Sequence, residues 1–140
     1  MYLLETNVVS ELRKPRADRQ VKRWAESVPA ASLYLSAITV LELETGVLQV
    51  ERRDAKQGAA LRRWMDAHVL PAFAGRILPI DATVALRCAR LHSPNPMAHG
   101  DALIAATALV HGFIVVTRNT ADFEAAEVEL FNPWTAPERP

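Results

Sequence analysis

Residues 101–117 read DALIAATALVHGFIVVT, and this stretch joins the most apolar helix that the sequence predicts to a buried strand. Asp101 opens the helix, and Gly112 ends it at a position where a left-handed residue is usual. The β-branched run that follows, Phe113 to Thr117, predicts a buried strand. A helix that leads into such a strand is typical of an α/β protein with a parallel sheet.

The rest of the chain repeats this alternation of strands and helices. Further strands are predicted at residues 2–4, 33–35 and 77–78 and, more weakly, at 128–131. Helices are predicted from Thr6 until Pro15 stops the first one, and at about residues 18–27, 37–53, 55–69 and 81–92. We therefore expect a central, mainly parallel sheet of four to five strands that helices cover on both faces.

Length and composition predict one self-sufficient domain. The chain has 140 residues, and half of them are apolar, so it can bury a core without disulfides or a structural metal. The single cysteine, Cys88, cannot form an internal disulfide, and its helix predicts a buried small side chain. We expect the domain to span residues 1–134 and residues 135–140 to form a frayed tail.

Nothing in the sequence predicts a membrane segment. The longest nearly uniform apolar run, Ala102 to Val110, is too short to cross a bilayer. Glu5 lies inside the apolar stretch at the N-terminus, where a signal peptide would have a basic region. These features predict a soluble, cytoplasmic protein without a membrane partner.

The charge of the chain gives a mixed indication about nucleic acid. Sixteen Lys and Arg residues balance sixteen Asp and Glu residues, so the overall positive field of many nucleic-acid binders is absent. Residues 1–63 carry a charge of +3 and residues 64–140 a charge of −3. Ordinary solvated helix faces account for most of this difference.

Four acidic residues fall where a parallel sheet collects its ligands, beyond the carboxyl ends of the strands. Glu5 ends the first strand, and Glu42 lies in the first two turns of the helix after the second. Asp101 opens the helix before the strand at Ile114, and Asp122 follows that strand. Gathered carboxylates repel one another unless a proton or a cation neutralises them, and a hard divalent cation takes oxygen ligands. The pattern therefore predicts a metal site.

Each acid also has a simpler structural interpretation. Asp101 alone could be a helix N-cap, and Asp122 a turn former. Glu42 lies among apolar residues, so we expect it to be buried or half-buried with a partner, whereas Glu44 should face solvent. Trp64 and Met65 could belong to the core or to an interface.

Several motifs resemble those of VapC and FitB-like PIN-domain toxins. Residues 2–15, YLLETNVVSELRKP, resemble the opening of these proteins. Residues 100–108, GDALIAATA, resemble their third acidic motif, and residues 115–123, VVTRNTADF, resemble their fourth. Asn132-Pro133-Trp134 is similar to the FitB-like branch. The resemblance covers about residues 1–134.

This resemblance implies a three-layer α/β/α PIN-like domain that cuts RNA as an endoribonuclease with Mg²⁺, for which Mn²⁺ can substitute. It also implies a homodimer and a cognate VapB-like antitoxin whose tail enters the active site. The implied catalytic and metal-binding residues are Glu5, Glu42, Asp101 and Asp122. Polar positions beside the metal are implied at Asn7, Thr117 and Asn119, for which capping and turn chemistry is an equal alternative. Arg13, Lys14 and Arg118 flank these motifs as candidate phosphate contacts or as solvated surface.

One departure from the family pattern bears on activity, because Glu5 stands where these toxins have Asp. The extra methylene carries the carboxylate roughly 1–1.5 Å further from the backbone. Mg²⁺ demands near-ideal octahedral geometry, and a misplacement of about 1 Å can cost about a hundredfold in rate. We therefore predict a weakened nuclease.

Two other hypotheses remain open from the sequence. An inactive PIN-like module would bind antitoxin or RNA without cutting it. A generic α/β binding protein without metal is disfavoured, because it would leave Glu42 without a partner in its apolar helix.

Overall fold

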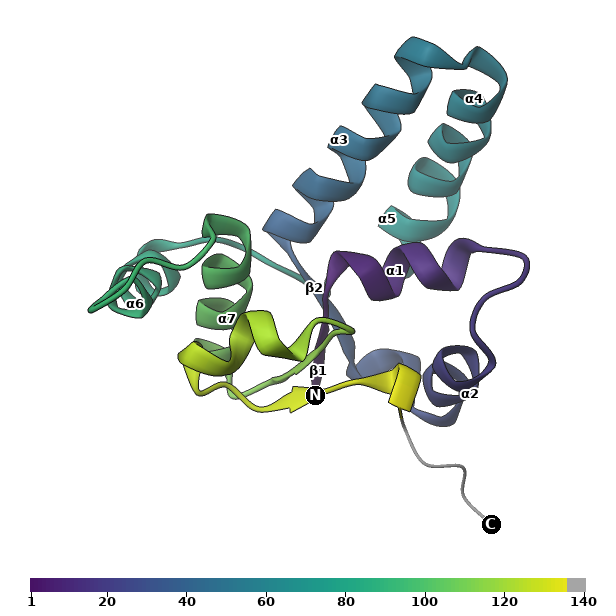
Figure 1. Ribbon diagram of the computed structural model, residues 1–140. Helices are drawn as coiled ribbons and strands as arrows, with labels where there is room; N and C mark the ends of the chain where they lie inside the picture. The colour runs from purple at the N-terminus through teal and green to yellow at the C-terminus, as the bar shows by residue number, and fades with distance from the viewer. Residues whose placement is uncertain (136–140) are drawn as a thin grey trace.

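The computed structural model of the protein describes residues 1–135 and is built around a five-stranded sheet (Figure 1). The strands lie in the order β3-β2-β1-β4-β5, and every neighbouring pair is parallel. Their bounds are β1 Tyr2–Leu4, β2 Leu33–Ser36, β3 Ile77–Leu78, β4 Ile114–Val116 and β5 Leu130–Phe131. The predicted parallel sheet is confirmed.

Helices fill most of the chain between the strands. Their bounds are α1 Thr6–Arg13, α2 Arg19–Ser27, α3 Ala37–Arg53, α4 Ala55–Trp64, α5 Leu70–Ala72, α6 Ala82–Leu91 and α7 His99–His111. Shorter turns are the 3₁₀ segments η1 Ala30–Ser32, η3 Thr120–Ala126 and η4 Pro133–Thr135 and the π-helical turn η2 Met65–Val69. Several helices start where a side-chain oxygen accepts from a backbone N–H of the first turn, as at Asp18, Ser36, Asp54 and Asp81.

Two helix boundaries differ from those predicted. The helix expected to end at residue 69 continues through η2 into α5. Its backbone hydrogen bonds change from the α to the wider π pattern just before Pro71, which has no N–H to donate. Helix α7 begins at His99 instead of Asp101, after Ala98 at the N-cap position. Asp101 makes no side-chain cap bond, so its interpretation as an N-cap is wrong.

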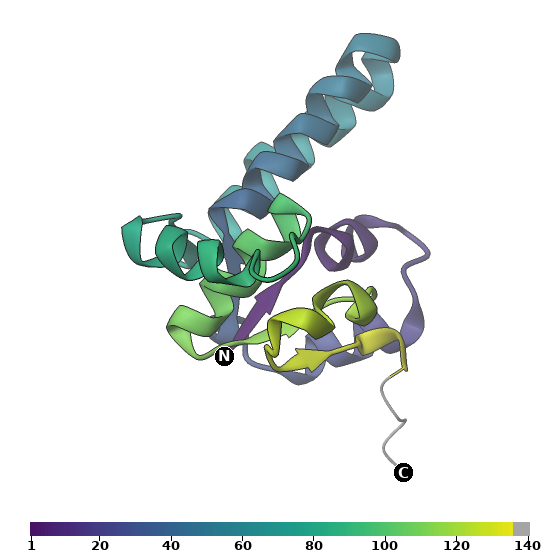
Figure 2. The ribbon, with the colours of Figure 1, turned by 60° about the vertical axis from the view of Figure 1, so that its left-hand side comes forward.

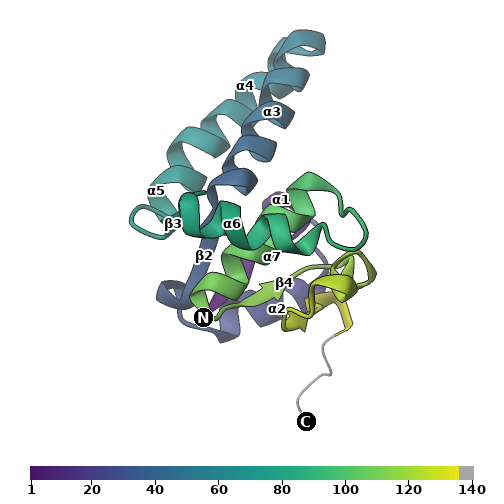
Figure 3. The ribbon, with the colours of Figure 1, turned by 90° about the vertical axis from the view of Figure 1, so that its left-hand side faces the viewer.

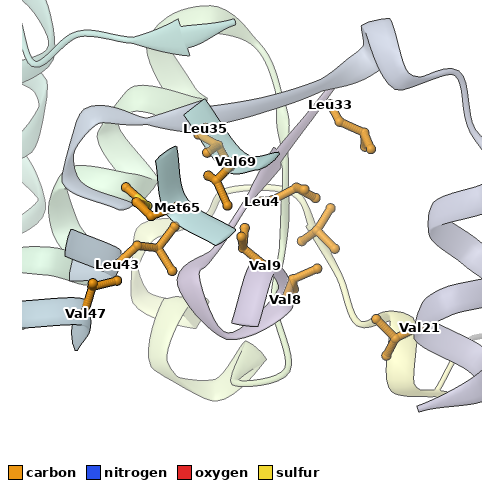
Figure 4. Packing of buried hydrophobic residues seen from close by; sticks show 11 residues of the cluster. Leu4, Val8, Val9, Val21, Leu33, Leu35, Leu43, Val47, Met65 and Val69 are labelled. Carbon is orange, nitrogen blue, oxygen red and sulfur yellow. The ribbon is translucent and has the colours of Figure 1, made fainter. Parts of the chain in front are cut away.

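The sheet separates two apolar clusters, because successive side chains of a strand point to opposite faces. Leu4 packs with residues of α1, α2, α3 and η2 in one cluster, which Figure 4 shows. Leu3 packs with α7 and η3 in the other. Figures 2 and 3 show α6 and α7 together on one side of the molecule and α1 on the other. The expected three-layer α/β/α architecture is confirmed.

Helices α3 and α4 form a hairpin that projects from the body of the molecule (Figures 1 and 2). Gly58 lies so close to α3 that a Cβ atom there would meet the Glu51 Cα at 2.5 Å. The Arg62 guanidinium joins the two helices by hydrogen bonds to Glu44 and Glu51. At the base of the hairpin Met65 is 1% exposed and belongs to the core, whereas Trp64 is half-buried against it.

The structure also bears on Cys88, on membrane-spanning helices and on the C-terminal tail. Cys88 is buried between α6 and α7, as predicted, and its burial raises the pKa of the thiol. No helix within residues 1–135 is long and apolar enough to cross a membrane. Of the tail expected at residues 135–140, Thr135 belongs to η4 and the rest lies outside the described residues.

Candidate active site

The carboxyl edge of the sheet brings together polar side chains from four distant segments. Glu5 follows β1, and its backbone N–H donates to the Val116 carbonyl at the end of β4. Glu42 lies in the second turn of α3, Asp101 in the first turn of α7 and Asp122 in η3. Electrostatic repulsion couples Glu5 to Asp101 and Glu42, and couples Asp101 to Glu42 and Asp122. The four predicted acids therefore share one electrostatic environment.

Glu5 is half-buried and firmly held. The Thr117 hydroxyl donates to Glu5 Oε2, and the Asn7 side chain supplies a further hydrogen bond. Burial raises the pKa of Glu5, and the nearby carboxylates of Asp101 and Glu42 raise it further, against these two hydrogen bonds. Folding thus holds Glu5 in place while opposing its negative charge.

Asp101 carries a similar electrostatic cost. Burial raises the pKa of Asp101, and repulsion from Asp122 and Glu42 adds to the effect. Asp122 itself is exposed, and its backbone N–H, not its carboxylate, closes the turn with the Asn119 carbonyl. The Asp101 carboxylate therefore does not cap its helix, and the Asp122 carboxylate does not form its turn.

The structure contradicts the prediction that Glu42 is buried or half-buried, because its side chain is exposed on α3. Its partner is a hydroxyl, since Thr6 Oγ1 donates to Glu42 Oε1 at 2.7 Å. The expectation for Glu44 was also wrong. That residue is half-buried and forms a two-point ion pair with Arg62 at 2.8 Å on each oxygen. The argument from an unpartnered Glu42 against a metal-free binding protein therefore fails.

The three accessory polar residues differ in what they contact. Thr117 is fully buried, and its hydroxyl both donates to Glu5 and accepts from the Asn119 N–H at 3.0 Å. Asn7 Oδ1 is buried and has no hydrogen-bond partner among the described residues. Asn119 is exposed and contributes a backbone N–H. Thr117 thus combines turn chemistry with a contact in the acidic cluster.

The three candidate phosphate contacts are placed differently from one another. Lys14 is ion-paired with Glu11 at 3.2 Å. Arg13 lies 5.8 Å from the centre of the Trp64 ring and lines a cleft of about 310 Å³ between α1 and α4. It is about 10 Å along α1 from Thr6, at 1.5 Å per residue. Arg118 directly follows Thr117 and lies over the Trp134 ring.

The candidate ligand atoms have the right chemistry for a hard divalent cation, but their positions do not yet form a coordination site. All candidate ligands are oxygens: the four carboxylates and the unpartnered Asn7 Oδ1. Burial and the neighbouring carboxylates raise the pKa values of Glu5 and Asp101, and a bound cation would offset both effects. Within residues 1–135, however, no three His, Cys, Asp or Glu side chains are already arranged to hold one ion. A cation would have to draw the carboxylates together.

Two residues of the site were missed in the sequence. The sequence marks Thr6 only as the start of the first helix, although it lies between two candidate site residues, and in the structure its hydroxyl donates to Glu42. Gly100 lies beside the same carboxylate, and a Cβ atom there would stand 3.4 Å from Glu42 Oε2. Its position next to Asp101 was a usable signal, since a missing side chain leaves room beside a site.

Fold and site together define an α/β domain with an acidic site at the carboxyl edge of a parallel sheet. The PIN domain family model matches residues 2–128, and the chain belongs to this family. It is 42% identical to the VapC ribonuclease Y4jK of Sinorhizobium fredii, over 96% of this chain and 98% of that protein.

Solved structures give the same assignment. FitAcB from Neisseria gonorrhoeae matches with a TM-score of 0.90 and 42% identity, over 97% of this chain and 100% of that chain. A toxin–antitoxin complex from Klebsiella pneumoniae matches with a TM-score of 0.69 and 28% identity, over 95% and 98% of the two chains. The resemblance seen in the sequence motifs is confirmed.

Proposed function

We propose that this protein is a metal-dependent endoribonuclease and the toxin of a toxin–antitoxin pair. The observation that carries the proposal is the electrostatic cluster of Glu5, Glu42, Asp101 and Asp122 at the carboxyl edge of a PIN domain. A relative named a ribonuclease and a structural neighbour named a toxin–antitoxin complex support it.

The four carboxylates would hold Mg²⁺ or Mn²⁺, with Asn7 Oδ1 as a further oxygen donor. When bound, such a cation activates a water molecule and stabilises the charge that develops on a phosphate. Thr117 and Asn7 orient the Glu5 carboxylate, and Thr6 orients that of Glu42. Hydrogen bonds of this kind fix the direction of a ligand's lone pairs.

Glu5 is the residue to which we assign weakened activity. Its side chain makes no cap bond to α1 and reaches Thr117 instead. The shorter side chain of Asp would place its carboxylate nearer the start of α1, by roughly 1–1.5 Å. A shift of about 1 Å in a catalytic group can change the rate about a hundredfold.

RNA would approach the acidic edge with help from cationic side chains. Arg118 adjoins the cluster in sequence, whereas Arg13 is further along α1 and Lys14 is engaged with Glu11. We therefore rank Arg118 first among the phosphate contacts. The proposed protein partner is a VapB-like antitoxin that blocks the same edge.

Cleavage of a mixed cellular RNA pool in Mg²⁺ and in Mn²⁺ tests the proposal. The comparison includes this chain, its Glu5→Asp variant and its Asp101→Asn variant. We expect Glu5→Asp to cut on the order of a hundredfold faster than the parent and Asp101→Asn not to cut. If none of the three cuts with either metal, the nuclease proposal is wrong.

The second candidate is an inactive PIN module that binds antitoxin or RNA. Two features favour it: Glu5 stands where the resemblance implies Asp, and no three His, Cys, Asp or Glu side chains of the described residues are arranged to hold one ion. Calorimetric titration with Mn²⁺ separates the candidates. Binding that is lost in Asp101→Asn supports the nuclease, and no binding by any variant supports the inactive module.

A further inference from the structure

The closing segment Asn132-Pro133-Trp134 contacts the loop that carries Thr117 and Arg118. Strand β5 pairs with β4, and the Thr117 N–H donates to the Phe131 carbonyl at 3.0 Å. One residue later, Asn132 Nδ2 donates to the Arg118 carbonyl at 3.4 Å, while Asn132 Oδ1 accepts from the Trp134 N–H at 2.9 Å. Asn132 therefore fixes the main chains of both Arg118 and Trp134.

The Trp134 indole is placed to control where the Arg118 side chain lies. Trp134 is half-buried and, like Trp24 and Phe131, packs against the core. It belongs to η4, which packs on α2 (Figure 1). The Arg118 guanidinium lies over its ring, 5.2 Å from the ring centre. A guanidinium on a fixed aromatic face loses little further freedom when it binds a ligand.

No residue among 1–135 uses the N–H donors of the Arg118 side chain. Its side chain is exposed, and within residues 1–135 the guanidinium takes part in no hydrogen bond or salt bridge. Stacking on a ring leaves the N–H groups at the edge of the guanidinium free, and these groups match the oxygens of a phosphate. Arg62, by contrast, uses its N–H groups in hydrogen bonds to Glu44 and Glu51.

We propose that Trp134 is a positioning residue that holds Arg118 as a phosphate-binding group for the backbone of single-stranded RNA beside the acidic cluster. This inference rests on the proposed function and deepens it. It gives a role to the Asn132-Pro133-Trp134 motif, which the carboxylate chemistry alone leaves without one. Trp134 itself touches neither the phosphate nor the cation.

Salt dependence of RNA binding provides the test, because each phosphate contact contributes about 0.7 to the slope of log Kd against log salt for a single strand. The full chain and its variants are titrated with a fluorescent 12-nucleotide single-stranded RNA in EDTA, so that metal-dependent cleavage is absent. We expect Arg118→Gln and Trp134→Leu each to lower the slope by about 0.7 and the affinity by roughly tenfold. The double variant should be no weaker than Arg118→Gln alone.

Trp134→Phe keeps an aromatic face and should retain the parental slope. Arg53→Gln, at the far end of α3, removes one positive charge away from the site and serves as the matched control. If Trp134→Leu lowers thermal stability but leaves the slope unchanged, Trp134 is only a core residue and the inference is wrong. An unchanged slope for Arg118→Gln overturns it as well, while the proposed nuclease survives. If the folded parent binds no RNA at low salt, this inference is wrong, whereas the nuclease proposal is still decided by RNA cleavage in Mg²⁺ and Mn²⁺.

Discussion

Glu5 meets opposing demands at the end of β1. Hydrogen bonds from Thr117 and Asn7 favour its charged form, whereas burial and the carboxylates of Asp101 and Glu42 disfavour it. Burial is the largest of these effects, so the pKa of Glu5 is raised. A residue with this balance of forces gains charge stabilisation when a cation arrives.

The raised pKa of Glu5 has a consequence for stability against pH. The folded protein binds the Glu5 proton more tightly than the unfolded chain does, and this difference stabilises the fold. The stabilisation from Glu5 is fully present below its ordinary pKa of 4.5. It is lost as pH rises through the higher pKa of the folded state. Gln at position 5 does not titrate, so we expect Glu5→Gln to become more stable relative to the parent as the pH rises from 4 to 7. Urea denaturation in EDTA measures this difference.

Glu11 provides a control of opposite sign. The backbone N–H of Asp18 and the Lys14 ammonium lower the pKa of Glu11, so its contribution is present above the ordinary pKa and is lost as pH falls. Glu11→Gln should therefore lose more stability relative to the parent at pH 7 than at pH 4. Parallel trends for Glu5→Gln and Glu11→Gln would contradict the electrostatic account of the site.

Thr6 allows the orientation of Glu42 to be tested without changing an acid. Thr6→Val has nearly the same shape but lacks the hydroxyl that donates to Glu42 Oε1. We expect kcat/KM for RNA cleavage to fall by about tenfold, as is usual when a partner of a metal ligand is removed. Thr6→Ser should retain most of the activity. Equal rates for the Val and Ser variants would show that the hydroxyl has no such role.

At the scale of elements, the α3–α4 hairpin depends on close approach at one end and on a charge cluster further down. Gly58 permits the approach of α4 to Glu51, and Arg62 binds Glu44 and Glu51. The hairpin carries Glu42 on its first two turns and Met65 at its base. Its packing therefore bears on both the core and the candidate site.

Two glycines of this hairpin should respond oppositely to alanine. In Gly46→Ala the new Cβ meets nothing within 4 Å, so the variant should gain about 0.5–1 kcal/mol from helix propensity. In Gly58→Ala the new Cβ would meet the Glu51 backbone, and overpacking should cost about 1–3 kcal/mol. Chemical denaturation gives both values. A Gly58→Ala variant as stable as Gly46→Ala would mean that α3 and α4 can move apart at residue 58 without loss of unfolding free energy.

At the scale of the whole molecule, binding of a cation should be visible in global stability. A ligand that binds only the folded state at a hundredfold its Kd adds about 2.7 kcal/mol, which raises Tm by roughly 5–10 °C in a domain of this size. We expect Mn²⁺ to raise Tm at pH 7 and to do so much less in Asp101→Asn, measured by circular dichroism. An identical shift in both proteins would place the bound cation away from the acidic edge.

Much of the fold follows from local chemistry. The helices predicted to begin near residues 18, 37 and 81 begin within one residue of those positions, where Asp18, Ser36 and Asp81 cap them. Gly112 ends α7 in the left-handed conformation that was predicted. Acids that follow strands were expected at one edge, and repulsion between these carboxylates adds to burial in raising the pKa of Glu5 and of Asp101. These features depend on neighbours within a few residues, or on the general rule that parallel strands end at the same edge.

The sequence by itself determined the alternation of strands and helices, the order of the acids and the family. Only the tertiary structure decided that Glu42 is exposed and bonded to Thr6, that Arg62 takes Glu44, and that Arg118 lies on Trp134. The physical reason is the range of the interactions. Propensity, caps and periodicity act along the chain, whereas the partner of a long polar side chain depends on which distant segments packing brings within a few ångströms of it.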